Sequence, residues 1–114
     1  MTATRTDITV EQGVDFSQAL DITDTTGRTY TVTTYDRFGN EVDAGMEVEV
    51  TDGTTITLTM SDDDSDDMIA PANFAYGQRL GKWGTYIVVE TVTATGVKSR
   101  PYEGDVKISL EVPA

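Results

Sequence analysis

The sequence predicts an all-β fold, namely an immunoglobulin-like antiparallel β-sandwich with one short helical turn. The first observation behind this prediction is strict alternation of apolar and polar residues. In the run 105–112, Val106, Ile108 and Leu110 fall on one face and Lys107 on the other. Side chains on a strand alternate between its two faces, so such a run buries one face and exposes the other. Several half-buried strands in a short chain indicate two sheets packed together or one closed sheet.

The second observation is a regular series of turn signals, which occur at Gln12-Gly13, Thr26-Gly27, Phe38-Gly39-Asn40, Asp52-Gly53 and Thr95-Gly96. Glycine accepts positive φ, and a neighbouring Asn or Asp supports a tight turn. Asp52-Gly53 lies between two alternating runs and predicts a hairpin. The predicted strands lie near residues 6–12, 15–23, 28–36, 45–51, 54–60, 84–94, 97–103 and 105–112. About seven or eight short strands are typical of an immunoglobulin-like sandwich.

The acidic run 61–68 interrupts the β pattern. Ser61 followed three residues later by Asp64 resembles a helix capping box with Asp in place of Glu or Gln. Acidic residues in a first turn also interact favourably with the positive end of the helix dipole. We expect one helical turn here, which ends before Pro71.

Length and composition exclude several kinds of chemistry. A chain of 114 residues is expected to form one domain, residues 1–114. It has no cysteine and no histidine, which removes thiolate metal sites and the commonest general base. Its serines have no nucleophile elbow. We therefore expect no enzyme activity and no cofactor.

The charge balance bears on partners. A net charge of −12 repels phosphates and anionic lipid head groups, so we expect neither a nucleic acid nor a membrane partner. No apolar stretch approaches the length of a membrane span, and we expect no secretory signal, because the first ten residues have no hydrophobic core region. Residues 1–6 contain no core-forming pattern, and we interpret them as an N-terminal arm, either reaching a neighbour or loose.

A long aromatic and basic loop is predicted at residues 72–83. Aromatic residues and arginine are enriched at protein interfaces. The residues predicted to contact a partner are Phe74, Tyr76, Arg79 and Lys82. In the alternative interpretation, Phe74 and Trp83 close one end of the sandwich. Trp83 precedes a central strand and is expected in the core, whereas Tyr76 and Arg79 are expected at the contact. An exposed sheet edge is a second interface candidate.

The acidic run also suggests a calcium site. Asp62, Asp64 and Asp66 occupy alternate positions, as at the start of an EF-hand loop. The loop pattern then fails, because Asp67 stands where glycine is required and Asn73 stands where glutamate is required. We therefore favour a solvated helix cap over a metal site.

The order of these features resembles that of small virion proteins of tailed bacteriophages, in particular the N-terminal β-sandwich domain of baseplate and fibre-attachment proteins. The matching segments are Ile8 to Gly13 followed by Phe16, Asp24 to Gly27, Gly53 to Thr59, Gly84 with Tyr86, and Gly104 with Val106 and Ile108. The resemblance covers nearly the whole chain. It departs from the pattern at residues 72–83, which are longer than the usual link, and we expect no C-terminal extension that would be a fibre or receptor-binding part.

The resemblance implies a structural protein of the virion that acts without catalysis. Its partners would be other virion proteins and copies of itself, and it would be assembled in the host cytoplasm. The two departures leave open whether it belongs to tail, baseplate, fibre attachment or capsid surface. An alternative class is an extracellular adhesin or carbohydrate-binding module, in which exposed aromatic rings stack on sugars. A third class, a small acidic hydrolase, requires a pocket lined by two carboxylates.

Overall fold

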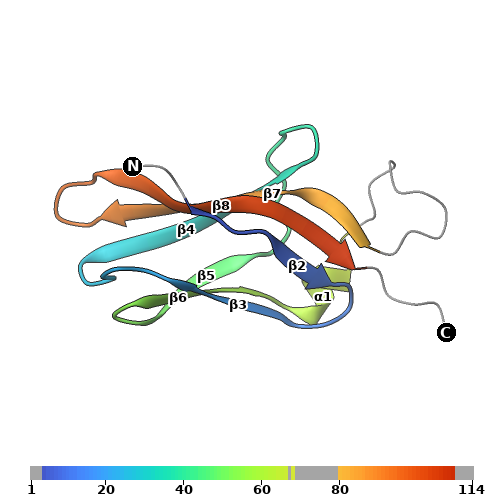
Figure 1. The fold of residues 1–114 in the computed structure, drawn as a ribbon, viewed down its shortest axis with the longest axis horizontal. Helices are drawn as coiled ribbons and strands as arrows, with labels where there is room; N and C mark the ends of the chain where they lie inside the picture. Colours follow the sequence, from blue (N-terminus) through green and yellow to red (C-terminus); the bar gives the residue numbers. More distant parts are fainter. Residues whose placement is uncertain (1–3, 67, 69–79, 110–114) are drawn as a thin grey trace.

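The structure, a computed structural model, describes residues 4–66, 68 and 80–109. This part of the chain forms two β-sheets packed face to face (Figure 1). The elements are β1 (Thr4–Arg5), β2 (Ile8–Glu11), β3 (Phe16–Asp21), β4 (Arg28–Asp36), β5 (Glu47–Asp52), β6 (Thr55–Met60), α1 (Asp62–Asp66), β7 (Leu80–Val92) and β8 (Lys98–Ser109). No described helix is long and apolar enough to cross a membrane.

The strand order defines the fold class. Sheet A runs β1-β8-β7-β4, with β2 also paired to β8, and sheet B runs β3-β6-β5. The facing orders β3-β6-β5 and β8-β7-β4 correspond to the B-E-D and G-F-C strands of an immunoglobulin sandwich. The predicted fold class is therefore confirmed, including the single helical turn.

The N-terminal strands correct one part of the prediction. Both β1 and β2 pair with β8 in parallel, with Thr4 opposite Tyr102 and Ile8 opposite Val106, whereas the other described pairs are antiparallel. Parallel neighbours need a long connection, and here almost the whole domain connects them. The prediction of an arm over residues 1–6 is wrong for residues 4–6. Thr4 and Arg5 form β1 of sheet A, and the N–H of Thr6, which follows β1, donates to the Glu103 carbonyl at 2.9 Å.

The C-terminal strand also differs from the prediction, because the expected strands 97–103 and 105–112 form one strand, β8, over the described residues. Gly104 lies inside it, where a Cβ atom would stand 2.2 Å from the Thr6 carbonyl oxygen. Glycine is needed there because another backbone passes close by, and no turn is made. A single sequence does not show whether a glycine makes a turn or gives room to a neighbouring backbone.

Strand β7 begins at Leu80, earlier than the predicted residue 84, so the end of the predicted loop 72–83 is a strand. The pairing of β7 with β8 shifts between Lys82 and Gly84, which leaves Trp83 as the extra residue. A bulge of this kind redirects a side chain. Trp83 is half-buried and packs against the core, which confirms the prediction that it belongs there.

The core lies between the sheets and follows the predicted alternation. Its fully buried side chains include Val10, Ile56, Leu58, Val88, Val106 and Ile108. The residues between them on β6 and β8, such as Thr57 and Lys107, are more exposed. The predicted hairpin at Asp52-Gly53 joins β5 to β6, where the Asp52 Oδ1 atom accepts the Thr54 N–H at 2.8 Å.

Helix α1 begins as predicted after Ser61. The Ser61 Oγ atom accepts the Asp64 N–H at 3.2 Å and donates to the Asp64 carboxylate at 3.0 Å. The cap is therefore present, but the acidic side chain meets the serine hydroxyl, whereas in a full capping box it would meet the serine N–H. Aspartate is one methylene shorter than glutamate, which accounts for the difference.

Candidate functional site

The predicted partner contact is only partly within the described structure. Phe74, Tyr76 and Arg79 lie outside the described residues, so their role stays a prediction. Lys82 lies on β7, and its Nζ atom is 3.4 Å from the Asp105 carboxylate. Arg5 binds the same carboxylate at 2.8 Å. Lys82 is therefore a strand residue whose charge is paired within sheet A, which corrects its placement in a free loop.

The three candidate calcium ligands do not converge. Successive residues of an α-helix are about 100° apart around its axis, so Asp64 projects about 160° away from both Asp62 and Asp66. Asp64 instead caps the helix through Ser61. Within the described residues, no group of three or more acidic side chains is placed to hold a metal ion.

Several other acidic side chains hold the backbone in place. A hydrogen bond from a backbone N–H lowers the pKa of the carboxyl groups of Asp7, Asp24, Asp36 and Asp52. For Asp52 the donor is the Thr54 N–H, which is the largest cause of the lowered pKa. These carboxylates stay charged at neutral pH, so this part of the acidic composition serves the fold.

The connection between β4 and β5 contains a turn in which an aspartate side chain accepts two backbone hydrogen bonds. The Asp36 Oδ1 atom accepts the N–H of Phe38 at 2.8 Å and the N–H of Asn40 at 3.0 Å. The Asp36 backbone also bonds to Gly39 and Asn40, at 3.1 and 2.8 Å. Gly39 has φ of 84°, a conformation that favours glycine. These hydrogen bonds hold the backbone of the turn from Asp36 to Asn40 in place.

This turn presents Arg37 and Phe38, which we call the Arg–Phe tip. Phe38 is 73% exposed, the highest exposure of any large apolar residue in the described structure. The Arg37 guanidinium carbon lies 4.5 Å from the centre of the Phe38 ring. In Figure 1 the β4–β5 connection rises beyond sheet A, on the side away from sheet B. The sequence predicted a turn at Phe38-Gly39-Asn40 but did not single out Arg37 and Phe38 as contact residues. The signal for the tip is an Asp three residues before a Gly, with Arg and Phe between them.

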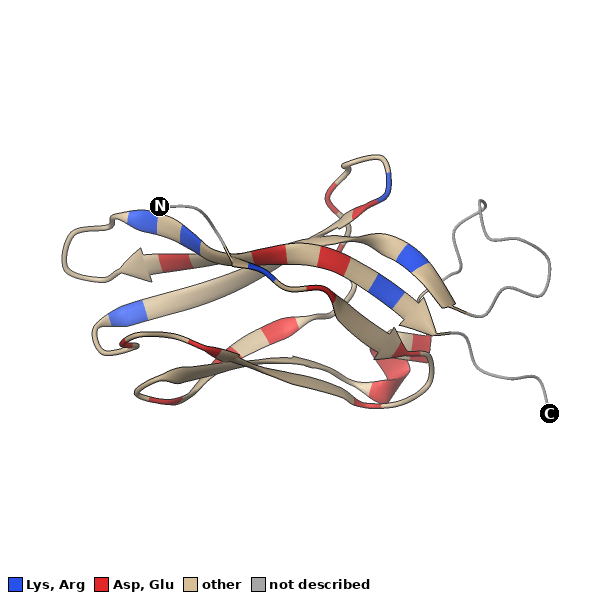
Figure 2. Ribbon diagram, in the orientation of Figure 1, with Lys and Arg blue, Asp and Glu red and all other residues tan. Residues whose placement is uncertain are grey.

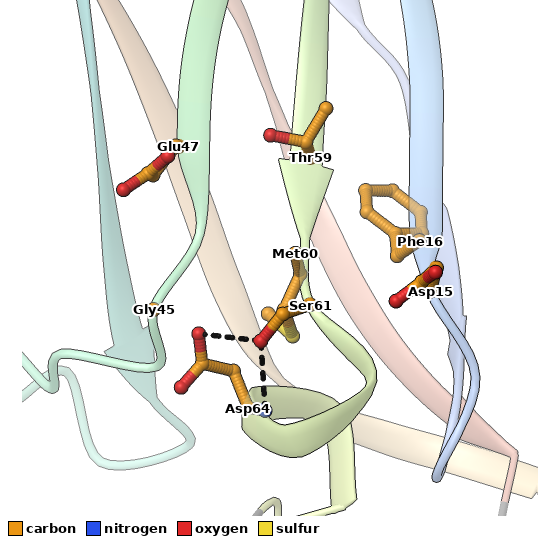
Figure 3. A pocket seen from close by; sticks show the side chains of 8 residues that line it. All are labelled: Asp15, Phe16, Gly45, Glu47, Thr59, Met60, Ser61 and Asp64. Carbon is orange, nitrogen blue, oxygen red and sulfur yellow. Dashed lines mark hydrogen bonds between the residues drawn. The ribbon is translucent and has the colours of Figure 1, made fainter.

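A hollow of about 400 Å³ lies at the α1 end of sheet B (Figure 3). Phe16 and Met60 line its apolar part, and three acidic residues also line it, namely Asp15, Glu47 and Asp64. We call it the acidic hollow. Two of its carboxylates serve the start of α1, because Asp15 accepts the Asp62 N–H at 2.8 Å and Asp64 is bonded to Ser61.

Gly45 allows the acidic hollow to form. Its φ is 81°, and a Cβ atom there would lie 2.4 Å from the Asp64 carboxyl carbon. The chain therefore passes directly beside Asp64 before β5 begins. This approach, between a loop and a helix far apart in the sequence, could not be read from the sequence.

Acidic residues lie on both sheets, whereas basic residues lie almost entirely on sheet A (Figure 2). In the described structure, β3, β5, β6 and α1 contain no Lys or Arg, although each contains or adjoins acidic residues. The described cations lie on the strands of sheet A, apart from Arg37 at the Arg–Phe tip. The acidic hollow therefore lies on elements without a cation of their own.

The described structure thus defines the class of protein, an immunoglobulin-like β-sandwich. No family model and no curated protein matches the chain. Among solved structures, the M1 domain from titin is 15% identical, with 96% of this chain and 91% of that chain covered and a TM-score of 0.38. The fold class follows from the strand order given above.

Proposed function

We propose that this chain is a non-catalytic assembly module that binds other proteins and copies of itself through its exterior. The observation that carries the proposal is the Arg–Phe tip, an exposed aromatic residue and an arginine on a turn already held in one conformation. Aromatic residues and arginine dominate interface hot spots. A preorganised turn also loses little conformational entropy on binding.

An open sheet edge supports the same function. Strand β4 pairs with β7 along its length without a bulge, and in the described structure no strand pairs with its other side between Thr29 and Thr33. Proteins that avoid edge pairing usually place lysine, proline or a bulge at such an edge. This segment of β4 has none of these, so it is suited to accept a strand from a partner.

The finer form of the proposal follows from the resemblance to phage virion proteins. The chain would be an adaptor or decoration subunit of a bacteriophage particle, assembled in the host cytoplasm. Contacts through Phe74, Tyr76 and Arg79 belong to the same proposal. Symmetric particles repeat one contact many times, so that individually weak contacts suffice.

The test is whether the chain is part of a particle. The gene would be tagged in its own genome, and particles would be purified through a density gradient. We expect the chain to sediment with intact particles, and the double variant Tyr76→Ala/Arg79→Ala to be incorporated less. Particles that assemble without the chain at any position would contradict the proposal.

The adhesin alternative is favoured by one observation, the exposed ring of Phe38. A glycan array separates the two functions, because sugar binding that is lost in Phe38→Ala would favour a carbohydrate-binding module. The hydrolase alternative would use the acidic hollow. We favour docking there, because two of its three acidic side chains are engaged at the start of α1.

A further inference from the structure

We infer that the Arg–Phe tip of one copy docks into the acidic hollow of a second copy, in a head-to-tail contact. The inference deepens the proposed assembly function and rests on it for its biological role. Three features of the described structure support the geometry of this contact. They are the shape of the hollow, its charge and its position relative to the tip.

The hollow suits the tip in shape. Its volume of about 400 Å³ lies within the range of pockets that enclose small ligands, about 300–1,000 Å³. Phe16 and Met60 form its apolar floor, and with 9% and 3% of their surfaces exposed they offer an incoming aromatic side chain a small area for ring–ring and sulfur–ring contacts. Phe38 is the described residue that most needs such a cover, because most of its surface is exposed to water.

The charges are complementary. Arg37 makes a contact with the Phe38 ring, but it forms no ion pair within the described structure. Glu47 lines the hollow from β5 with an exposed side chain, and it too has no ion pair there. An arginine and a carboxylate brought together form strong, often bidentate hydrogen bonds. We therefore expect Arg37 of one copy to meet Glu47 of the next.

The positions of the tip and the hollow make the contact head-to-tail. The tip rises on the sheet A side of the sandwich (Figure 1), whereas Glu47 and Thr59 line the hollow from strands of sheet B (Figure 3). One copy can therefore use its tip and its hollow at the same time. Such a heterologous contact closes into a ring or continues as a filament, depending on the rotation between copies.

The contact is small and is expected to be weak for an isolated pair. A standard protein interface buries about 800 Å² of surface on each partner, and one turn in one hollow buries less than this. Repulsion between two chains of net charge −12 opposes it further. Its repetition in a particle, or tethering to a larger partner, would raise the effective affinity.

The experiment measures self-association of the purified chain at physiological ionic strength, by sedimentation velocity over a wide range of concentration. We expect Phe38→Ala, Arg37→Glu and Glu47→Arg each to weaken association at least about tenfold. Combining Arg37→Glu with Glu47→Arg in one chain should restore association, because the ion pair is then reversed. Matched controls are Val97→Ala and Lys98→Glu, the same kinds of change at two other exposed residues. They should weaken association far less than tenfold, because Lys98→Glu adds only to the general repulsion between chains.

A mixing experiment tests the head-to-tail geometry. One chain carries Arg37→Ala and Phe38→Ala, which disable the tip, and the other carries Glu47→Lys, which disables the hollow. Each alone should be monomeric. Mixed, they should form a 1:1 complex that does not grow, because each pair has one intact tip facing one intact hollow. Circular dichroism of every variant confirms that the fold is kept.

Three results would overturn the inference. These are a wild-type chain that stays monomeric at the highest concentration, tip and hollow variants that associate like the wild type, or a charge-reversed double variant that is not restored. A different result would contradict the proposed function. A chain that associates through tip and hollow but is absent from particles contradicts the function and leaves the inference standing.

Discussion

Glu90 is the only charged residue of the described structure whose side chain is buried between the sheets. Its carboxylate accepts hydrogen bonds from Arg28 at 2.9 Å, from the Tyr30 hydroxyl at 2.7 Å and from Ser99 at 3.5 Å. A buried charge is tolerated when it is paired and hydrogen-bonded. This cluster therefore stabilises the end of the sandwich where β4, β7 and β8 meet, and it plays no part in the candidate contact.

Replacing Glu90 tests this structural role. Glu90→Ala leaves Arg28 and Tyr30 without their shared acceptor, and we expect the free energy of unfolding to fall by about 1–3 kcal/mol. This loss is smaller than the loss of about 3–5 kcal/mol typical of a fully buried ion pair, because Arg28 is partly exposed. Urea denaturation measures the change. Glu49→Ala, an exposed glutamate on β5, is the matched control and should change stability by less than about 0.5 kcal/mol. Equal effects of the two variants would contradict the role.

Tyr86 gives the fold a dependence on alkaline pH. Its hydroxyl donates to the Thr6 carbonyl at 2.5 Å, and burial raises the pKa of Tyr86 from 10.0 to about 12. As the pH rises, the unfolded chain loses this proton first. The stability contributed by Tyr86 is therefore complete below pH 10.0 and is lost between pH 10.0 and about 12.

We expect the free energy of unfolding to fall over this pH range, and to fall less steeply in Tyr86→Phe. At neutral pH the same variant should lose about 0.5–1.5 kcal/mol, the net worth of one hydrogen bond. Chemical denaturation at a series of pH values gives both quantities. Tyr35→Phe serves as the control, and an identical alkaline slope in wild type and Tyr86→Phe would count against the assignment.

At the scale of elements, α1 fastens the connection between β2 and β3. Ser65 is completely buried, and its Oγ atom accepts the Gly13 N–H at 3.1 Å and lies 2.9 Å from the Val14 carbonyl oxygen, to which it donates. Gln12 reaches the Met68 carbonyl at 3.0 Å. The acidic run was predicted as a helix cap, and its tertiary task is to hold a loop far away in the sequence.

Ser65→Ala should therefore act on that loop. The variant leaves the Gly13 N–H and the Val14 carbonyl without their partner, and we expect a loss of about 1 kcal/mol because both groups are only partly buried. Amide hydrogen exchange at Gly13 should become faster relative to the strands of sheet A. Ser17→Ala, which changes an exposed serine on β3, is the control. Unchanged protection of the Gly13 amide in Ser65→Ala would contradict this role of Ser65.

Two glycines provide a second test at this scale. In Gly104→Ala the new Cβ atom would meet the Thr6 carbonyl oxygen at 2.2 Å, so β8 or the segment after β1 must shift. We expect a loss of about 1–3 kcal/mol, as for other overpacked sites. Gly53 has open space around it and no positive φ, so Gly53→Ala should be nearly neutral. Thermal unfolding of both variants checks the difference, and a Gly104→Ala protein as stable as Gly53→Ala would contradict the close approach.

For the whole molecule, the dominant property is the net charge of −12. Acidic residues without nearby cations on sheet B and α1 repel one another in the folded state. Raising the ionic strength shortens the screening length from about 30 Å to about 8 Å and weakens this repulsion. We expect the Tm to rise between low and physiological salt, and to rise more in Lys98→Glu. A Tm that falls with added salt would contradict this account.

The alternating pattern determined most of the strands and the buried faces of β2, β6 and β8, because a period of two assigns each side chain to one side of a strand whatever its partner. It did not determine where β7 begins or that β8 is one strand, and Val50 on β5 is exposed although the pattern places it on a buried face. The hairpin at Asp52-Gly53, the helix start at Ser61 and the core position of Trp83 follow from equally local chemistry. Only the tertiary structure decided that β2 pairs with β8 in parallel, that Gly104 lies inside a strand, and that Gly45 meets Asp64. These contacts join segments far apart in the chain, and no local pattern specifies which of several compatible strands will pair.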